Sequence, residues 1–595
     1  MDQNTNNNLY DIEVVDLDYD FDDTLHPENN NSNLSADEAL IECINRYGYV
    51  DLTYMCEISG LSIDELISEL RGTAIFQDPD VFHGISNWSM EDGWLLAPRY
   101  LCGNIPEKYA VAVKAEERFP GCFGANIEAL RRLMPAKLSL EEIHVSLGAS
   151  WVPSWIYTSF ICDLLRITVP PTVYFNKELS TWKIEILDIL RTSVANNYTY
   201  GTIDLPAIRI IEQTMNARTV KVYDYTYYYN GTFDRVFNKA KTLEAQEKQR
   251  TIIRAFEEWI FADEYRKAKL QEAYNDTYVG YTFSPYNGSF LHLPGLNPDI
   301  ELYQHQRDAI ARILLSQSNV LLAHDVGTGK TYEMVVSAHE LKRMGLSDKN
   351  LVVVPNNVLK ATVDAHKLLY PDDKILAVFP KDFAPKYRKE TLEAIRDNDY
   401  VCVYMAYSSF DMIVMSKDYW VKKKQQNIRD LRSAAANCSR KDEKRVLELE
   451  ADQQSKKLSK FVLEAQDTPW LPFEKLGITT LFVDEAHNYK NIPLTSRTDN
   501  IVGMHNNGSK KCREMFEKCH NVERVIFATG TPLTNSLADL FVLQSYLQQN
   551  ELRFREIDSF DMWINTFGER ETNFEIDVDA GNLRPMTRFS SFHKA

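Results

Sequence analysis

Residues 321–332, which read LLAHDVGTGKTY, constrain the fold of this chain more than any other stretch. An apolar run ends in a turn that contains Gly327 and Gly329, and Lys330 and Thr331 follow at once. The next residues, EMVVSAHELKR, carry apolar side chains at helical spacing. A strand, a glycine turn, a Lys-Thr pair and a helix in this order predict a phosphate-binding loop.

The residue types in this turn suit polyphosphate binding. The two glycines flank Thr328 and let backbone N–H groups close around phosphates without a Cβ in the way. Lys330 can place its ammonium group beside the outer phosphates of ATP, and the Thr331 hydroxyl can ligate Mg²⁺. The strict pattern has a glycine where His324 stands, so an ordinary strand–helix turn is the alternative for this stretch taken alone.

Composition restricts the class of protein. The chain has 595 residues, of which 44% are hydrophobic and 25% charged, as in a globular protein with several domains. No apolar run approaches the roughly 20 residues that span a membrane, and the polar, acidic start is no secretory signal. Nine cysteines without metal spacing fit a reducing cytoplasm. The net charge of −19 argues against a protein coated in nucleic acid, although a local basic groove can coexist with it.

The chain is expected to fall into several parts. Residues 296–550 alternate short β-branched runs, such as NLVVVP and DYVCVYMAY, with helical patterns, which predicts an α/β domain with a parallel sheet and helices on both faces. A charged, glycine-free run at 417–466 predicts a helical hairpin inserted in this domain. The other parts are expected to be a disordered acidic tail (1–33), a helical N-terminal domain (34–167), a mixed α/β region (168–295) and a partial C-terminal extension (551–595).

Two of these segments leave a DNA-binding alternative open. Between residues 48 and 72, two short amphipathic helices flank a glycine turn, which is compatible with a helix-turn-helix. The acidic second helix favours two packed helices of a helical domain instead. The inserted hairpin has an excess of Lys and Arg, so a DNA-contacting arm is the alternative to a solvated surface hairpin. A strand hairpin is also predicted at 170–187. Residues 219–233 predict an aromatic strand that ends in an Asn230-Gly231 turn, and base stacking is the alternative to a packed or half-exposed sheet face.

A second motif joins two carboxylates to a buried strand. The sequence ITTLFVDEAHNYKN at 478–491 predicts a strand with Asp484 and Glu485 at its C-terminal end. In a parallel sheet that end faces the same crevice as the phosphate loop. Asp484 can hold Mg²⁺ through water, and Glu485 can orient or deprotonate an attacking water molecule. His487 could couple this site to another motif.

A third motif reads RVIFATGTPLTNSLADLFVLQSYL at 524–547 and predicts another buried strand, a turn and a helix. The turn places the hydroxyls of Thr529 and Thr531 on either side of Gly530. These groups are suited to hydrogen bonding His487 and thereby to relaying the state of the nucleotide.

The three motifs together resemble the first motor lobe of superfamily 2 helicases, specifically the Swi/Snf-type double-stranded DNA translocases. VDEAHNYKN is similar to the DEAH box of that group, and ATGTPLTNS to its TGTP motif with the following Asn535. LVVVPNN is similar to the strand that enters a motif contacting the tracking strand, which implies nucleic-acid contacts for Pro355 and Asn356. Gln306 falls where the family has its adenine-reading glutamine, but His305 replaces the usual tyrosine. The resemblance implies a RecA-like fold, ATP and Mg²⁺ as cofactors, and DNA, expected to be double-stranded, as partner.

Segments ahead of the motor, including YLCGNIPEKYAVA and IHVSLGASWVP, resemble the corresponding part of large helicase proteins from phages and conjugative elements. The antirestriction helicase–methyltransferase polyproteins are one branch of that group. The chain contains no Asn-Pro-Pro-Tyr-type methylation motif, so no methyltransferase activity is expected.

The motor of this family has a second RecA-like lobe with arginine fingers, each worth on the order of 10³–10⁵ in rate. Too few residues follow Leu547 for another sheet domain, so the chain is expected to be a fragment, a split-gene product or a truncated form that hydrolyses ATP slowly by itself. A missing segment or a separate chain would supply the second lobe. Two alternatives stay open. One is the motor of a restriction enzyme, which more often has a TATP or SAT turn in place of the one with Gly530, and the other is a non-catalytic DNA-binding or inhibitory protein.

Overall fold

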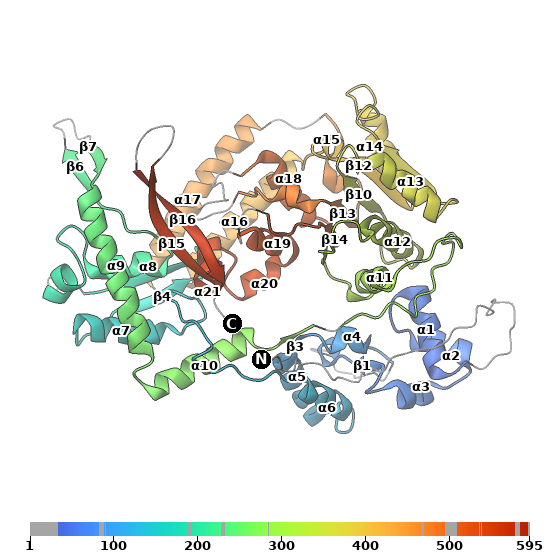
Figure 1. Cartoon of the computed structure of the whole chain (residues 1–595), viewed down its shortest axis with the longest axis horizontal. Coiled ribbons are helices and arrows are strands. Elements are labelled where there is room, and N and C mark those ends of the chain that lie inside the picture. The colour runs from blue at the N-terminus through green and yellow to red at the C-terminus, as the bar shows by residue number, and fades with distance from the viewer. Residues whose placement is uncertain are drawn as a thin grey trace, which may run out of the picture.

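The computed structural model describes most of the chain after the N-terminal tail. The described residues are 34–82, 89, 91–187, 193–227, 233–283, 285–438, 440–465, 469–493, 508–534, 536, 538–576 and 583–592. The expected tail at 1–33 and the expected Asn230-Gly231 turn lie outside them. Figure 1 shows the central sheet next to the N-terminal helices on one side of the molecule and a second mixed group of helices and strands on the other.

A six-stranded, all-parallel sheet forms the centre of the α/β domain and confirms the predicted fold class. In chain order its strands are β9 (Val320–Leu322), β10 (Asn350–Val354), β11 (Ile375–Val378), β12 (Cys402–Ala406), β13 (Thr480–Asp484) and β14 (Arg524–Ala528). In space the order is β11-β12-β10-β13-β14-β9. Ala528 is level with both Asp484 and Leu322 in the register, so three neighbouring strands end at the same edge.

Alternation along the strands builds a hydrophobic core on each face of the sheet. In β10, Val352 and Val354 belong to one core, whereas Leu351 and Val353 belong to the other. The first core is covered by α11 (Gln304–Ser316), α12 (Lys330–Arg343) and α13 (Leu359–Leu369). The second is covered by α14 (Arg388–Asp397), α15 (Tyr407–Phe410), α18 (Lys510–Cys519) and part of α19 (Ala538–Leu547). Helices therefore lie on both faces, as the alternating sequence pattern predicts.

The N-terminal helices pack directly on the sheet domain. They are α1 (Ala36–Tyr47), α2 (Leu52–Ser59) and α3 (Ile63–Leu70), followed by the antiparallel pair β1 (Ile75–Gln77) and β2 (Trp94–Leu96). Capping boxes at Ser35 and Ser62 start α1 and α3, and Gly60, with φ 73°, ends α2. The three helices share a core with α11 and α12, and Arg343 donates to the Asn45 carbonyl. The region continues with α4 (Ala97–Tyr100), β3 (Gly103–Asn104), α5 (Ile105–Arg118) and α6 (Gly124–Arg132).

A third hydrophobic core lies in the mixed region and includes residues from the C-terminal part of the chain. The region contains α7 (Ser154–Leu165), β4 (Thr172–Asn176), β5 (Thr181–Glu185), α8 (Ala207–Met215), β6 (Tyr223–Tyr227), β7 (Phe233–Phe237), α9 (Lys239–Ile260), α10 (Glu264–Tyr278) and β8 (Tyr281–Thr282). The predicted hairpin is present as β4–β5, and the predicted aromatic strand is β6, which pairs with β7. Helices α20 (Gln549–Phe554) and α21 (Phe560–Phe567) add Leu552 and Trp563 to this core. The chain then forms the hairpin β15 (Gly568–Ile576) and β16 (Leu583–Phe592), which no sequence pattern predicted.

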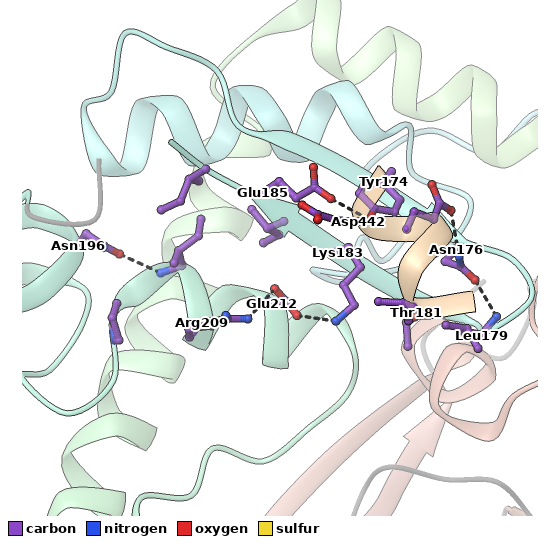
Figure 2. Close-up of a pocket in the computed structure, with 16 residues that line it drawn as sticks. Tyr174, Asn176, Leu179, Thr181, Lys183, Glu185, Asn196, Arg209, Glu212 and Asp442 are labelled. Carbon is purple, nitrogen blue, oxygen red and sulfur yellow. Dashed lines mark hydrogen bonds and ion pairs between the residues drawn. The ribbon is translucent and has the colours of Figure 1, made fainter. Parts of the chain in front are cut away.

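The inserted helical hairpin is present and is docked on the mixed region. It consists of α16 (Lys417–Asn437) and α17 (Lys441–Glu464), with Leu179 from the β4–β5 turn packed against their shared core. Asn176 Nδ2 donates to Glu443 Oε1 at 2.9 Å. Between β4–β5, α8 and the start of α17 lies a cavity of about 430 Å³ (Figure 2). One side of the hairpin is therefore a contact surface.

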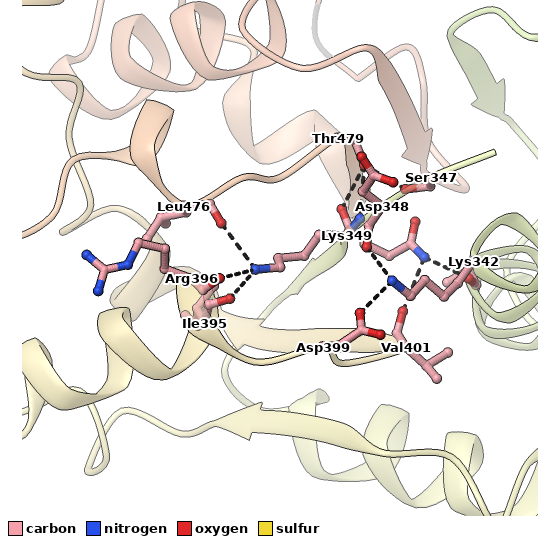
Figure 3. Close-up of polar contacts among 12 residues, drawn as sticks. Lys342, Ser347, Asp348, Lys349, Ile395, Arg396, Asp399, Val401, Leu476 and Thr479 are labelled. Atoms are coloured by element: carbon pink, nitrogen blue, oxygen red, sulfur yellow. Dashed lines mark hydrogen bonds and ion pairs between the residues drawn. The ribbon is translucent and has the colours of Figure 1, made fainter. Parts of the chain in front are cut away.

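Lys349 lies at the amino end of the sheet and connects α14 to the segment before β13 (Figure 3). The residue is 9% exposed. Its ammonium group donates to the carbonyls of Ile395, Arg396 at 2.8 Å and Leu476 at 3.4 Å. The first two carbonyls end α14, and the third lies on the segment that enters β13. Burial lowers the pKa of Lys349, yet three acceptors match the three hydrogens of the ammonium form.

We expect Lys349→Met to lower the free energy of unfolding by about 3 kcal/mol, because it strips buried carbonyls of a charged donor. Lys342 is the matched control: its ammonium group contacts Asp399, a side chain that is 80% exposed. Such surface pairs contribute about 0–1 kcal/mol, so Lys342→Met should cost much less. Denaturant unfolding of both variants measures the difference. Equal losses would contradict the role given to Lys349.

Candidate functional site

The loop between β9 and α12 has the backbone that the sequence predicts for phosphate binding. Gly327 has φ 90° and Gly329 has φ 92°, in the left-handed region that disfavours side chains. A Cβ on Gly329 would lie 2.1 Å from Gln306 Nε2, whereas a Cβ on Gly327 would meet no atom within 4 Å. Gly329 is also the N-cap of α12, so the loop leads straight into the amino end of a 14-residue helix.

Lys330 lies at the mouth of this loop. Its ammonium group donates to the carbonyls of His324 at 2.8 Å and Asp325 at 2.9 Å. A Cβ added to Gly530 would be 3.5 Å from the same nitrogen, which places the third motif directly beside Lys330. Thr331 follows on the first turn of α12 and is half-buried.

His324, which departs from the strict glycine pattern, turns its side chain to α12. Its Nδ1 atom lies 2.9 Å from Oε1 of Glu333, a fully buried carboxylate. Burial raises the pKa of Glu333, and the neighbouring histidine opposes that shift. Among the described residues, Glu333 Oε2 has no hydrogen-bond partner. The histidine is therefore accommodated by a buried acid that the sequence did not single out.

Gln306 and His305, from the start of α11, also lie against the loop. Gln306 Nε2 donates to the Thr328 carbonyl at 3.2 Å, and its Oε1 accepts from the Tyr303 N–H at 3.0 Å. His305 Nε2 lies 3.0 Å from the same Thr328 carbonyl. The ring of Tyr303 stacks on His305 with centroids 5.8 Å apart and is 71% exposed. Tyr303 is thus an exposed aromatic ring next to the loop that sequence reasoning did not consider.

Asp484 and Glu485 stand at the carboxyl end of β13, next to the strand that carries the third motif. Burial raises the pKa of Asp484 and the charge of Glu485 adds to that rise, while Lys330 and His487 oppose it. Glu485 has φ 51°, a left-handed conformation that is uncommon for a residue with a side chain.

His487 joins the second motif to the third. Its Nδ1 atom lies 3.1 Å from Glu485 Oε2, 3.1 Å from Thr529 Oγ1 and 3.4 Å from Thr531 Oγ1. One ring nitrogen either donates or accepts, so it cannot satisfy a carboxylate and a donating hydroxyl together. Thr529 Oγ1 also accepts from the Thr531 N–H at 3.1 Å. The two motifs thus share one hydrogen-bonding position.

Two of the residues predicted to contact nucleic acid belong to the loop after β10. Pro355 and Asn356 follow β10, where Asn356 Nδ2 donates to Ser408 Oγ at 3.0 Å. Asn535 lies outside the described residues. The sequence pattern missed Tyr407, which follows β12 and whose hydroxyl reaches the carbonyls of Asp484 and Glu485. Its position just after a buried strand of the same sheet is the signal that could have found it.

The arrangement brings together one ammonium group, two carboxylates, four hydroxyls and the amino end of a helix at one edge of the sheet. The set comprises Gln306, Gly327, Thr328, Gly329, Lys330, Thr331, Asp484, Glu485, His487, Thr529, Gly530 and Thr531. Helix amino ends and lysines bind anions, and adjacent carboxylates bind Mg²⁺ or accept protons. None of these residues lines the 430 Å³ cavity, which is a separate feature.

Comparison with known families places the motifs in a helicase-related part of the chain. Residues 313–595 match the model of a family described as a probable helicase domain. Residues 32–88 match a probable helicase, winged helix domain, and residues 146–279 match a domain of unknown function (DUF8437). The first match covers the six strands of the sheet, all three motifs, and the C-terminal helices and hairpin. It begins after Gln306.

Individual relatives are distant. Helicase SWR1 from Kluyveromyces lactis is 22% identical over 302 residues, which is 48% of this chain and 14% of that protein. The Sulfolobus solfataricus SWI2/SNF2 ATPase core in complex with dsDNA aligns with 16% identity and a TM-score of 0.26, over 45% of this chain and 40% of that one. The matched part of the chain therefore spans well under half the length of each. Among the described residues, no helix combines the length and apolarity needed to cross a membrane.

The match at 32–88 bears on the helix-turn-helix alternative. The matched residues contain the helices α1 to α3 and the strand β1, whose partner β2 follows the match, and the matched family is described as winged helix. The second of the two predicted helices, α3, carries Asp64, Glu65 and Glu69 and no basic residue. Its buried face contacts the sheet domain's core through Leu66, Ile67 and Leu70. The two helices are thus packed helices, as the sequence favoured, and they lie in a segment that matches a family described as winged helix.

Proposed function

We propose that residues 296–550 form the ATP-binding lobe of a Swi/Snf-like, DNA-dependent ATPase that couples Mg·ATP hydrolysis to movement on DNA in the cytoplasm. One observation carries this proposal: the phosphate loop, the Asp484-Glu485 turn and the Thr529–Thr531 turn meet at one edge of the sheet, after β9, β13 and β14. The family description of residues 313–595 as a probable helicase domain supports it.

The residues present fit a magnesium nucleotide. The left-handed glycines leave the cradle free of Cβ atoms, and α12 points its amino end into it. Mg²⁺ is usually held by one or two protein groups together with phosphate and water oxygens, so Thr331 and Asp484 are a sufficient protein set. The raised pKa of Asp484 indicates a carboxylate that would gain from a nearby cation.

Each side chain then has one task. Lys330, released from the carbonyls of His324 and Asp325, would neutralise charge on the outer phosphates. Glu485 would orient the attacking water and accept its proton at a carboxylate oxygen. His487 would hydrogen bond either Glu485 or Thr529. A change of partner would transmit the state of the nucleotide site to the third motif. Bound Mg·ATP supplies the phosphoanhydride bond that is cleaved, with charge neutralisation by the metal.

Binding to DNA, and completion of the site by a second RecA-like lobe, are further parts of this proposal. The loop at Pro355 and Asn356 and the neighbourhood of Asn535 are the proposed nucleic-acid side, by their resemblance to translocase motifs. A second lobe in trans, or on a longer chain, would supply the arginine fingers. The preferred DNA is proposed to be double-stranded.

The experiment that tests nucleotide binding compares the wild-type chain with Lys330→Ala. The variant loses the one ammonium group at the mouth of the loop, so affinity for a fluorescent ATP analogue should fall by at least about tenfold, the effect of roughly 1.4 kcal/mol. Lys342→Ala, on the same helix but facing Asp399, is the matched control and should bind as wild type does. Equal affinity of Lys330→Ala and wild type would reject the phosphate-loop assignment.

A further inference from the structure

The carboxyl end of β12 contributes a side chain that belongs to none of the three motifs. Tyr407 is the first residue of α15, and its hydroxyl donates toward the backbone carbonyls of Asp484 and, at 3.1 Å, Glu485. A hydroxyl has one hydrogen, so the two carbonyls share it. Carbonyl oxygens only accept hydrogen bonds, so the Tyr407 hydroxyl acts as the donor in both contacts.

The turn that Tyr407 contacts needs support. Glu485 adopts φ 51°, which costs an L-residue roughly 1–2 kcal/mol relative to the right-handed region. Such a conformation persists where surrounding contacts define it. Asn488 supplies one contact, because its Nδ2 donates to the Glu485 carbonyl at 3.0 Å. Tyr407 supplies another contact from α15, the helix that follows β12, and it also reaches the Asp484 carbonyl.

The ring of Tyr407 is itself held in place. It packs edge-on against Tyr489, with ring centroids 5.1 Å apart. The Tyr489 hydroxyl donates to Asp411 Oδ1 at 3.0 Å, and the Tyr489 carbonyl accepts from the Tyr546 hydroxyl at 2.9 Å. These contacts fix the direction from which the Tyr407 hydroxyl donates to the Asp484-Glu485 turn.

The next residue, Ser408, faces the other candidate functional loop. Its N–H donates to Asn356 Oδ1 at 3.2 Å, and Asn356 Nδ2 donates back to Ser408 Oγ at 3.0 Å. Two consecutive residues therefore bond the turn that carries the proposed metal and water groups and the loop that follows β10. In the sheet, β12 is separated from β13 by β10, so this junction spans a strand to reach the turn.

We propose that Tyr407 is a positioning residue for the Asp484-Glu485 turn, and that the Tyr407-Ser408 junction links this turn to the Asn356 loop. Tyr407 fixes the two carbonyls and thereby the directions in which both carboxylates leave the backbone. Ser408 fixes the loop proposed to face nucleic acid. This inference rests on the proposed function, and it adds to it a physical connection between the nucleotide side and the DNA side of the lobe.

The test uses the full chain carrying Tyr407→Phe, which removes one oxygen and keeps the ring. Without Mg²⁺, the fluorescent ATP analogue should bind as tightly as it does to wild type. The gain in affinity on adding Mg²⁺ should shrink at least about threefold, and the single-turnover hydrolysis rate should fall roughly tenfold, the effect of one hydrogen bond. Tyr419→Phe is the matched control, because its hydroxyl bonds Glu517, which lies outside the site. An unchanged magnesium effect in Tyr407→Phe, or the same loss in Tyr419→Phe, would overturn the positioning role.

Ser408→Ala tests the link. It should leave hydrolysis without DNA unchanged and reduce the stimulation by duplex DNA about threefold or more, as loss of a hydrogen bond of roughly 0.7 kcal/mol would. Stimulation equal to that of wild type would reject the link and leave the positioning role standing. Amide hydrogen exchange at residues 484–489 separates failure of the inference from failure of the proposed function. Faster exchange in Tyr407→Phe, together with normal nucleotide binding by Lys330→Ala, would reject the function while keeping the structural role of Tyr407.

Discussion

Glu485→Gln should bind the ATP analogue as tightly as wild type and hydrolyse ATP about 10²- to 10⁴-fold more slowly, the usual effect of losing a general base. Glutamine has the size of glutamate and can still bond His487, which lies 3.1 Å from Oε2, but it cannot accept the proton of an attacking water. The side chain is 35% exposed, so water has access to it. Single-turnover hydrolysis with and without duplex DNA measures the rate.

The control for this substitution is Glu523→Gln. Glu523 is an exposed acid just before β14, at the opposite end of the sheet from the three motifs, and it should tolerate the same change without loss of rate. If Glu485→Gln and Glu523→Gln hydrolyse ATP equally fast, Glu485 is not the base. If the wild-type chain binds the nucleotide but none of the three proteins hydrolyses it, the non-catalytic alternative is favoured.

The meeting of the three motifs was predictable because it follows from the sheet. Asp484 ends an apolar strand, Thr529 directly follows one, and the loop before Lys330 begins where another ends. The carboxyl ends of parallel strands lie at one edge. The order of the strands adds the detail that β9, β14 and β13 are neighbours. That order is set by crossover helices and is not present in any local pattern. The sequence predicted the shared edge and the contact of His487 with the Thr529–Thr531 turn, which is present, but it did not predict the strand order.

Contacts between non-adjacent elements were beyond local patterns. His324 departs from the glycine pattern of the loop, and its ring contacts the buried carboxylate of Glu333 on α12. The amide of Gln306 bonds the Thr328 carbonyl, so its expected role in reading adenine stays a prediction. Trp563 is an apolar residue of a short helix, and only the folded chain shows that it packs in the core of residues more than 280 positions earlier, such as Tyr278.

The strongest test of the loop itself is Gly329→Ala beside Gly327→Ala. Both residues have φ near 90°, so either alanine should cost roughly 1–2 kcal/mol in strain. The two differ in surroundings, because a Cβ at 327 meets open space whereas one at 329 lies 2.1 Å from Gln306 Nε2. Gly329→Ala must therefore also displace the glutamine amide and its bond to Thr328.

We expect Gly327→Ala to weaken binding of the ATP analogue about 5- to 30-fold, which is the effect of that strain alone. Gly329→Ala should weaken it on the order of 100-fold, because the lost amide contact adds to the strain. Gly345→Ala, at a positive φ beyond the end of α12 and with no atom within 4 Å of its Cβ, controls for stability without touching the loop. A larger loss for Gly327→Ala than for Gly329→Ala would mean that Gln306 does not brace the cradle. Unchanged affinity in both variants would mean that the nucleotide does not bind in this loop. A bound anion accepts hydrogen bonds from these backbone N–H groups, so a change in their direction must change its affinity.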